Sequence, residues 1–291
     1  MPMWKAVILG IVQGLAEFLP ISSSGHLAII KEIMNVDLES GGMFFDIMLH
    51  LGTLVAIFIA FWGDIKRMIL EGFHIIGDVF YNIVTWIGCL VGREGKYHRI
   101  VRSSYRKFVM MVIVSTIPTG IIGILIKDTV EMASSFIIVP GICLLITAIF
   151  LTIADLVDPG DKRPREAKYS DAGLIGIAQG MATMPGLSRS GTTITACLLC
   201  GFEKRFAVKY SFIMSIPAVL GAVVLELKDV GKMSLQQADL IPCAVATVIA
   251  AFVGYLSIRI MMRLVQNKSY RGFVIYCALA GILAIGYGII Y

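Results

Sequence analysis

The stretch GIVQGLAEFLPISSSGH (residues 10–26) recurs without a gap as GIAQGMATMPGLSRSGT (residues 176–192). The residues that the two copies share are Gly10, Ile11, Gln13, Gly14, Ala16, Ser22, Ser24 and Gly25, which return as Gly176, Ile177, Gln179, Gly180, Ala182, Ser188, Ser190 and Gly191. Each copy lies in an apolar region that proline and a polar run interrupt. One copy in each half of the chain predicts a protein built from two related halves.

The chain around these copies is too apolar for a soluble protein. Of its 291 residues 57% are hydrophobic and 15% are charged, and the mean hydropathy is +0.84. An average soluble domain has about 25% charged residues. The sequence therefore predicts an all-α polytopic membrane protein. The net charge of +5 comes from basic residues between apolar segments, which indicates loops that face anionic lipid rather than a surface for nucleic acid.

About six segments have the length and apolar character of transmembrane helices. They are residues 43–63, 107–127, 136–157, 207–227, 240–263 and 272–291. The connections 64–106, 158–168 and 264–271 are rich in lysine and arginine, so the positive-inside rule predicts that they face the cytoplasm. Both termini are then expected on the outer side of the membrane.

The regions that contain the repeated motif, 5–34 and 172–202, are expected not to span the membrane. Proline and the run SSSGH break the first, and proline, glycine and the run SRSG break the second. Two half-length helices around a polar tip are typical of re-entrant hairpins. Each hairpin precedes three predicted crossings, and the two enter from opposite sides. The prediction is an inverted-topology repeat of residues 1–157 and 158–291 within one membrane domain.

The positions at which the two copies differ carry the chemically active side chains. The first copy has Glu17 and His26 where the second has threonine, and the second has Arg189 where the first has Ser23. An inverted repeat brings both polar tips to the middle of the bilayer, facing each other. A carboxylate, an imidazole, a guanidinium and several hydroxyls are therefore expected to meet in one site. Charged groups at this depth are functional by default.

Arg189 is the predicted phosphate ligand, because its planar guanidinium has donors that match phosphate oxygens. Neighbouring hydroxyls, with backbone amides at the start of the following helix, are expected to complete the anion site. These hydroxyls belong to Ser22, Ser188, Ser190, Thr192 and Thr193. The alternative is that Arg189 only neutralises Glu17 as a buried ion pair.

Gln13 and Glu17 lie four residues apart and therefore on one helix face. Glu17 is predicted to ligate a divalent cation there, with Gln13 binding it through its carbonyl oxygen or through a water. The cation would neutralise the charge of a phosphorylated substrate. A hydrogen bond that only packs helices together is the alternative for Gln13.

Ser23 and His26 are both candidate nucleophiles. His26 can attack directly or act as the general acid or base, and Ser23 can attack if the imidazole takes its proton. The sequence leaves this choice open. Asp46 and His50, one helical turn apart, are weaker candidates for a supporting pair.

Two motifs and the full-length pattern resemble the bacterial undecaprenyl-diphosphate phosphatase family, also called the bacitracin-resistance protein family. Gln13 and Glu17 match the (E/Q)xxxE element of that family, with Gln13 in place of the more acidic form, and residues 185–193 match its PGxSRSxxT element. The resemblance implies hydrolysis of undecaprenyl diphosphate to the monophosphate and inorganic phosphate, which recycles the lipid carrier of cell-wall synthesis and confers bacitracin resistance. It also implies dependence on Mg²⁺ or Ca²⁺ and a place in the bacterial inner membrane, so the outer side that the loop charges predict for both termini is the periplasmic side.

A transporter or lipid flippase for a phosphorylated substrate could use the same inverted repeat, and the fold alone does not exclude it. A transporter needs Arg189 to bind an anion but needs no nucleophile beside it. The predicted cluster around Arg189 therefore favours hydrolysis. The expected partners are the polyprenyl diphosphate substrate and membrane lipid, without nucleic acid, and a homodimer is left open.

Overall fold

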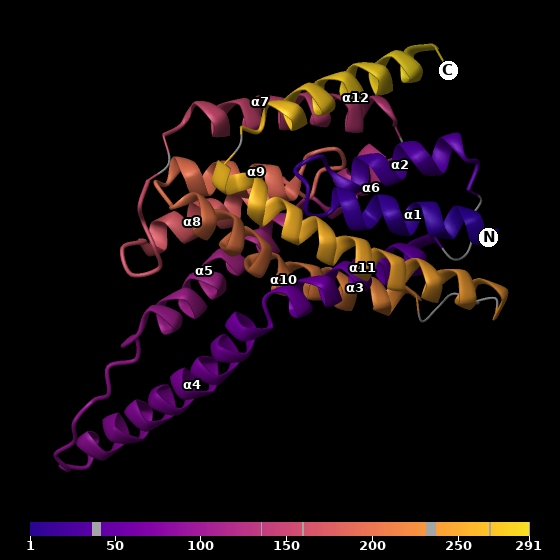
Figure 1. The fold of residues 1–291 in the computed structure, drawn as a ribbon. Helices are drawn as coiled ribbons and strands as arrows, with labels where there is room; N and C mark the ends of the chain where they lie inside the picture. The colour runs from indigo at the N-terminus through magenta and orange to yellow at the C-terminus, as the bar shows by residue number, and fades with distance from the viewer. Residues whose placement is uncertain (37–41, 135, 159, 231–236, 268, 291) are drawn as a thin grey trace.

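The structure is a computed structural model that describes residues 1–36, 42–134, 136–158, 160–230, 237–267 and 269–290. These residues form helices joined by turns and short connections, as predicted, with one isolated bridge between Lys162 and Phe202 (Figure 1). In chain order the helices are α1 (Met3–Ala16), α2 (Ser23–Ile33), α3 (Gly42–Ala60), α4 (Trp62–Leu90), α5 (Ser104–Leu125), α6 (Lys127–Ser134), α7 (Ile138–Leu156), α8 (Tyr169–Met181), α9 (Arg189–Leu199), α10 (Lys204–Val230), α11 (Gln237–Asn267) and α12 (Arg271–Ile290).

Seven of the described helices are long and apolar enough to cross a membrane, which makes the chain a multi-pass membrane protein. Six of them coincide with the predicted crossings: α3, α5, α7, α10, α11 and α12. The seventh, α4, falls almost entirely in the stretch 64–106, where a connection was predicted; only its first two residues precede that stretch. The sequence-based count of crossing-length helices is therefore one too low.

The helix α4 was missed because its charges are spread along the sequence but gather on one face. Polar side chains recur every three or four residues on that face: Glu71, His74, Asp78 and Asn82. Such spacing places them along one stripe of a helix. Large apolar side chains fill the other side and are exposed: Ile69, Phe73, Ile76, Phe80, Ile83 and Ile87.

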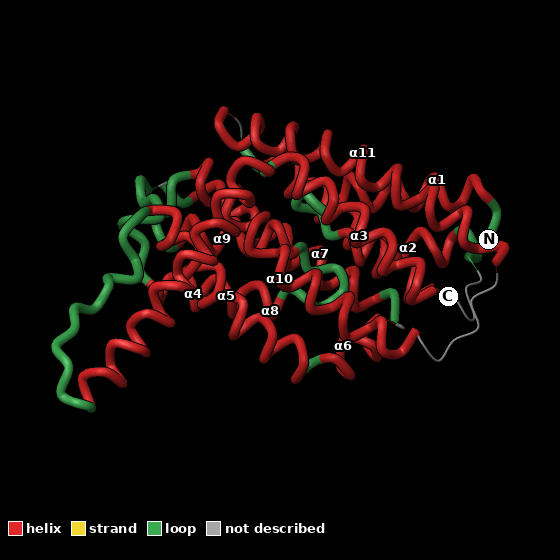
Figure 2. Tube along the Cα trace, turned by 90° about the horizontal axis from the view of Figure 1, so that it is seen from below, coloured by secondary structure: helices red, strands yellow, loops and turns green. Residues whose placement is uncertain are grey.

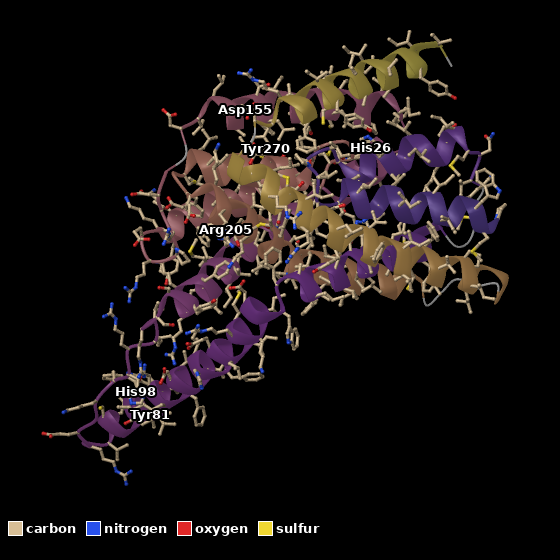
Figure 3. All side chains as sticks on the ribbon, viewed as in Figure 1. His26, Tyr81, His98, Asp155, Arg205 and Tyr270 are labelled. Carbon is tan, nitrogen blue, oxygen red and sulfur yellow. The ribbon has the colours of Figure 1, made fainter. Side chains whose placement is uncertain are left out.

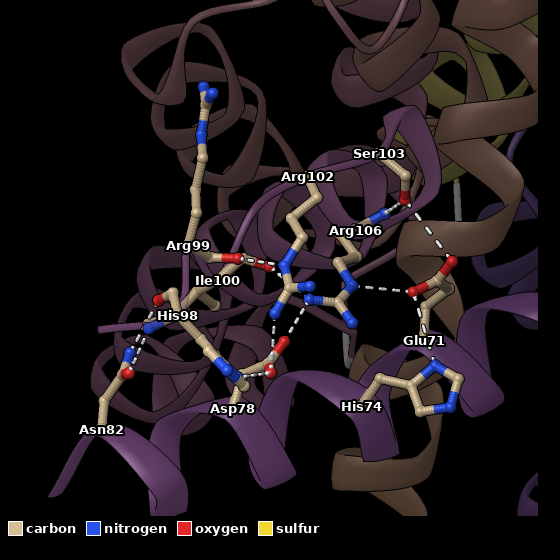
Figure 4. Close-up of polar contacts among 10 residues, drawn as sticks. All are labelled: Glu71, His74, Asp78, Asn82, His98, Arg99, Ile100, Arg102, Ser103 and Arg106. Atoms are coloured by element: carbon tan, nitrogen blue, oxygen red, sulfur yellow. Dashed lines mark hydrogen bonds and ion pairs between the residues drawn. The ribbon is translucent and has the colours of Figure 1, made fainter. Parts of the chain in front are cut away.

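The polar face of α4 holds the chain that returns from its far end, and together they project from the rest of the molecule as an arm (Figure 1). Arg106 donates to Glu71 from Nε at 2.8 Å and to Asp78 from Nη1 at 2.5 Å. Asp78 also contacts His98 and Arg102, each at 2.9 Å (Figure 4). Residues 98–106 are therefore tied to α4 by charge-assisted hydrogen bonds.

The two motif copies form two pairs of short helices, α1 with α2 and α8 with α9. A helix of 14 residues such as α1 is about 21 Å long, less than the roughly 30 Å of a bilayer's hydrocarbon core. The second helix of each pair begins with the same cap, because Ser22 accepts from the amide of Gly25 at 3.3 Å and Ser188 accepts from the amide of Gly191 at 3.1 Å. The repeated sequence thus has repeated local structure.

The halves of the chain are packed crosswise, since α1 lies mainly against α11 and α8 mainly against α5. Equivalent glycines permit both contacts. A Cβ on Gly10 would lie 2.7 Å from the carbonyl oxygen of Ala246 on α11, and a Cβ on its counterpart Gly176 would lie even closer to the carbonyl oxygen of Ser115 on α5. Either would be too close, so the glycines set the distance between the helices.

Both termini lie at the same end of the molecule, away from the tip of the α4 arm, in each of two perpendicular views (Figures 1 and 2). At the other end, Asp155 of α7 accepts a hydrogen bond from the amide of Tyr270 at 2.6 Å and so fixes the start of α12 (Figure 3).

Candidate functional site

The polar tips of the two hairpins touch each other. A Cβ on Gly25 would lie 2.9 Å from Cα of Gly186, and one on Gly191 would lie 3.4 Å from Cβ of Pro20. The backbone of Gly186 has φ +90°, a conformation that favours glycine and lets the second tip turn tightly. Residues from distant parts of the sequence therefore meet at one place.

Glu17 is the centre of this meeting. One carboxylate oxygen, Oε1, is bound by Nη2 of Arg189. The other, Oε2, accepts from the hydroxyl of Ser23 at 2.6 Å and from Nε2 of Gln13 at 3.1 Å. Glu17 is only 7% exposed, so its charge interacts with these partners at a lower dielectric constant than in water.

Arg189 is the first residue of α9, and its side chain is 23% exposed. The guanidinium has five N–H donors, and the contact with Glu17 leaves others for a ligand. Beside it, the hydroxyls of Ser188 and Ser190 lie 3.4 Å apart. The start of α9 adds the positive end of a helix dipole, which favours an anion.

The predicted hydroxyls lie in different environments. Ser22 and Ser188 cap the two helices at the tips, and Ser190 is directed toward the carbonyl of Leu19 at 3.4 Å. Thr193 instead faces α10, where its Oγ1 lies 2.5 Å from Oγ of Ser211. Thr193 therefore packs the tip against α10, whereas Ser188 and Ser190 flank Arg189 in the chain and Ser22 precedes Ser23, the partner of Glu17.

His26 lies within the helical body, away from His98 on the arm (Figure 3). Its Nδ1 is 2.7 Å from the carbonyl oxygen of Ser22, and its Nε2 is 2.6 Å from the hydroxyl of Tyr276. The two rings also stack, with centroids 5.4 Å apart. Both ring nitrogens are thus engaged, and the hydroxyl of Ser23 is bonded to Glu17 rather than to the imidazole.

Tyr276 is a neighbour of the site that no sequence pattern indicated. It is separated from His26 by 250 residues and lies in α12, which reads as an ordinary apolar crossing. Thr147 of α7 is similar: it is fully buried, and it accepts from the amide of Ser188 at 2.9 Å and donates to the carbonyl of Gly186 at 3.2 Å. Only the folded chain brings these residues to the tips.

The site provides some of the oxygen ligands that a divalent cation such as Mg²⁺ or Ca²⁺ needs, but not all of them. Oε1 of Gln13 is buried without a hydrogen-bond partner among the described residues, and it is an oxygen of the type that Mg²⁺ and Ca²⁺ prefer. Among those residues, no three histidines, cysteines or carboxylates form a metal-binding group. Asp46, the carboxylate of the candidate supporting pair with His50, is bound by Lys31 at 2.5 Å. Further ligands would have to be phosphate oxygens and water.

Comparisons with known proteins cover nearly the whole chain. The family model described as bacitracin resistance protein BacA matches residues 6–283. The chain is 39% identical over 281 residues to the undecaprenyl-diphosphatase of Methanosphaera stadtmanae, covering 97% of this chain and 96% of that protein. It is 39% identical over 286 residues to the protein of the same name from Alkaliphilus metalliredigens, with 98% of each chain covered. Against the undecaprenyl-diphosphatase of Halothermothrix orenii the identity is 35% over 285 residues, again covering 98% of each.

Proposed function

Because the chain belongs to the bacitracin resistance protein BacA family, we propose that the Glu17 cluster is where it hydrolyses undecaprenyl diphosphate to undecaprenyl phosphate and inorganic phosphate. The chain is a membrane-embedded undecaprenyl-diphosphatase, and its reaction recycles the lipid carrier of cell-wall synthesis. The observation that carries the assignment of the site is the bonding of one buried carboxylate to Ser23 and to Arg189 at once.

The bonding pattern supports Ser23 as the nucleophile and Glu17 as its base. Oγ of Ser23 would attack the terminal phosphorus while its proton moves to Oε2 of Glu17, which it already contacts at 2.6 Å. The bond between that phosphorus and the bridging oxygen breaks, and undecaprenyl phosphate leaves with the bond's electrons. Water then cleaves the phosphoserine and releases inorganic phosphate, with Glu17 moving the proton.

Arg189 would hold the terminal phosphate in line with Ser23. Its guanidinium reaches Glu17 from the opposite hairpin and binds Oε1 of the carboxylate, whereas Ser23 binds Oε2. Charge that develops on the phosphate oxygens would be stabilised by its remaining donors, by the start of α9 and by the hydroxyls of Ser188 and Ser190.

A divalent cation, Mg²⁺ or Ca²⁺, would be held by Glu17 and by Oε1 of Gln13. The unpartnered buried oxygen of Gln13 supports this assignment. The cation supplies positive charge that a diphosphate in a low-dielectric site requires beyond a single arginine. Oε1 of Gln13 would then hold the cation in position, while Nε2 of Gln13 keeps the Glu17 carboxylate in place by donating a hydrogen bond to it.

His26 would act as a positioning residue in this scheme. Its contacts join the tip of the first hairpin, through the carbonyl of Ser22, to the hydroxyl of Tyr276 on α12. The imidazole therefore fixes the backbone from which Ser23 projects, and it need not take the proton of Ser23.

The shared caps and the crosswise glycine contacts support an inverted-topology repeat with two re-entrant hairpins. In this topology 158–168 and 64–106 face the cytoplasm of a bacterial cell, whose inner membrane holds the protein. Both termini would be periplasmic, and their common end in Figures 1 and 2 agrees with that arrangement. The exposed apolar stripe of α4 suits a helix that lies along the membrane surface rather than across it.

The test is phosphate release from undecaprenyl diphosphate by the purified, detergent-solubilised protein. Glu17→Ala and Arg189→Lys should each lower turnover by about a hundredfold or more, since a lysine lacks the forked donors of arginine. Glu32→Ala, which removes an exposed carboxylate of α2, is the matched control and should keep the wild-type rate. Turnover at the wild-type rate in Glu17→Ala would exclude the proposed site.

A further inference from the structure

A second site of concentrated positive charge lies where the arm meets the helical body. A pocket of about 470 Å³ is lined by Arg99, Val101, Arg102, Ser103, Lys107, Arg165 and Tyr169. Its basic side chains come from the return segment of the arm, from α5 and from the connection before α8, which are far apart in the sequence. None of the described lining residues carries a carboxylate.

Part of this positive charge is not paired with acidic residues of the protein. Within the part of the chain that the structure describes, neither Arg99 nor Arg165 has an acidic partner, and both are exposed. The side chain of Arg99 extends away from the Asp78 cluster, whereas Arg102 is turned into it (Figure 4). Lys107 lies over the ring of Tyr169, 3.5 Å from its centroid. Arg102 is neutralised by Asp78, but Arg99 and Arg165 add positive charge to the pocket that no acidic residue among the described ones pairs with.

Two helices also begin at the pocket. Ser103 caps α5, and Tyr169 is the first residue of α8. Each start brings the positive end of a helix dipole, and the two lining residues add hydroxyl groups. Arginines, a lysine, hydroxyls and helix starts around a cavity are the groups that bind phosphate.

We propose that this pocket binds the phosphate group of an anion, either the headgroup of an acidic membrane lipid or free inorganic phosphate. It is separate from the Glu17 site. Tyr169 is at the start of α8, whereas the turn that leads to Arg189 follows the end of α8, about 20 Å of helix away. The start of α5, a helix of crossing length, lies beside it, so lipid headgroups and solutes both have access.

The experiment compares two double variants of the full chain in detergent. Arg99→Gln with Arg165→Gln removes two positive charges from the pocket. Arg93→Gln with Lys96→Gln removes two exposed positive charges from the same arm outside the pocket. Both pairs should keep the wild-type melting temperature and rate of phosphate release from undecaprenyl diphosphate, since none of these residues belongs to the Glu17 site.

Two probes distinguish the sources of phosphate. Equilibrium dialysis with radiolabelled inorganic phosphate, in an Arg189→Ala background that disables the Glu17 site, measures binding of the free anion. Native mass spectrometry of protein equilibrated with phosphatidylglycerol or phosphatidylcholine measures selection of an acidic headgroup. We expect the pocket variant to bind at least one probe at least tenfold more weakly, because the loss of a single hydrogen bond from a charged group to an anion already weakens binding by about that factor.

The pattern of loss identifies the ligand. If the pocket variant loses only phosphatidylglycerol binding, the pocket binds lipid. If it loses only the binding of inorganic phosphate, the pocket binds the free anion. Either result supports the site. Equal losses in the two double variants would show that the arm attracts anions only through its overall charge, and the proposal would be wrong. It would also be wrong if the pocket variant bound both probes as tightly as the wild type.

Discussion

The hydroxyl of Ser23 donates to Oε2 of Glu17 at 2.6 Å, while the other oxygen of the same carboxylate is bound by Arg189. The carboxylate thus connects the proposed nucleophile of one hairpin with the proposed phosphate ligand of the other. The two alternatives for Arg189, a phosphate ligand or a partner that neutralises Glu17, need not exclude each other, since a guanidinium has donors for both.

Ser23→Ala should reduce turnover by about a thousandfold or more, because the variant retains Arg189 and Glu17 but has no group to attack phosphorus. Ser24→Ala is the matched control: this serine is exposed and has only a 3.4 Å contact with Ser22, so its loss should change the rate little. Rapid quenching of the wild type should trap an acid-stable phosphoserine. An acid-labile phosphoenzyme would instead identify His26 as the nucleophile.

His26→Ala should lower turnover much less than Ser23→Ala, by about tenfold, because in the proposed mechanism the imidazole positions the tip and does not take the proton of Ser23. Tyr276→Phe removes the hydroxyl that Nε2 of His26 contacts, and it should have a smaller effect in the same direction. The pH dependence of turnover separates the roles. A residual rate in His26→Ala that rises with pH, unlike that of the wild type, would show that the imidazole is the base.

Removal of divalent cations with a chelator should abolish phosphate release, and Mg²⁺ or Ca²⁺ should restore it. Gln13→Ala should need a higher cation concentration for half-maximal activity, since it loses the unpartnered amide oxygen. Gln179→Ala removes the equivalent glutamine of the second copy, whose amide oxygen is also unpartnered. Because Thr183 stands there in place of Glu17, the variant should leave the cation requirement unchanged. Full activity of the wild type in chelator would contradict the proposed cation site.

Gly176→Ala should destabilise the protein by about 1–3 kcal/mol, because the added Cβ would overlap the carbonyl oxygen of Ser115 on α5. Gly173→Ala lies on the same helix with no atom within 4 Å of its Cβ, so the helix should be unaffected or stabilised by up to about 1 kcal/mol. Thermal unfolding in detergent measures both. Equal melting temperatures would argue against the close approach of α8 to α5.

Single cysteines introduced after replacement of the native six should report the orientation. In intact spheroplasts an impermeant thiol reagent should label Pro2→Cys, whereas Glu94→Cys on the arm should react only after the membrane is opened. The reason is the basic character of the connection 64–106, which favours the cytoplasmic side. Labelling of Glu94→Cys in intact spheroplasts would reverse the orientation.

The sequence by itself determined the membrane class, the positions of the crossing-length helices other than α4, and the residues of the motif copies. These features are local: an apolar run of about 20 residues or a repeated stretch can be recognised without its neighbours. The error at α4 has the same origin. Counting charges along a stretch conceals that residues such as Glu71 and Asp78 share one face of a helix.

Only the tertiary structure decided which groups touch. The sequence placed Ser23 and His26 three residues apart and suggested that they act together, yet the fold bonds Ser23 to Glu17 and His26 to Tyr276, 250 residues away. Likewise, no pattern connects Arg99 with Arg165. Such contacts depend on how rigid helices pack, and that packing is set by many weak interactions over the whole chain rather than by any short segment.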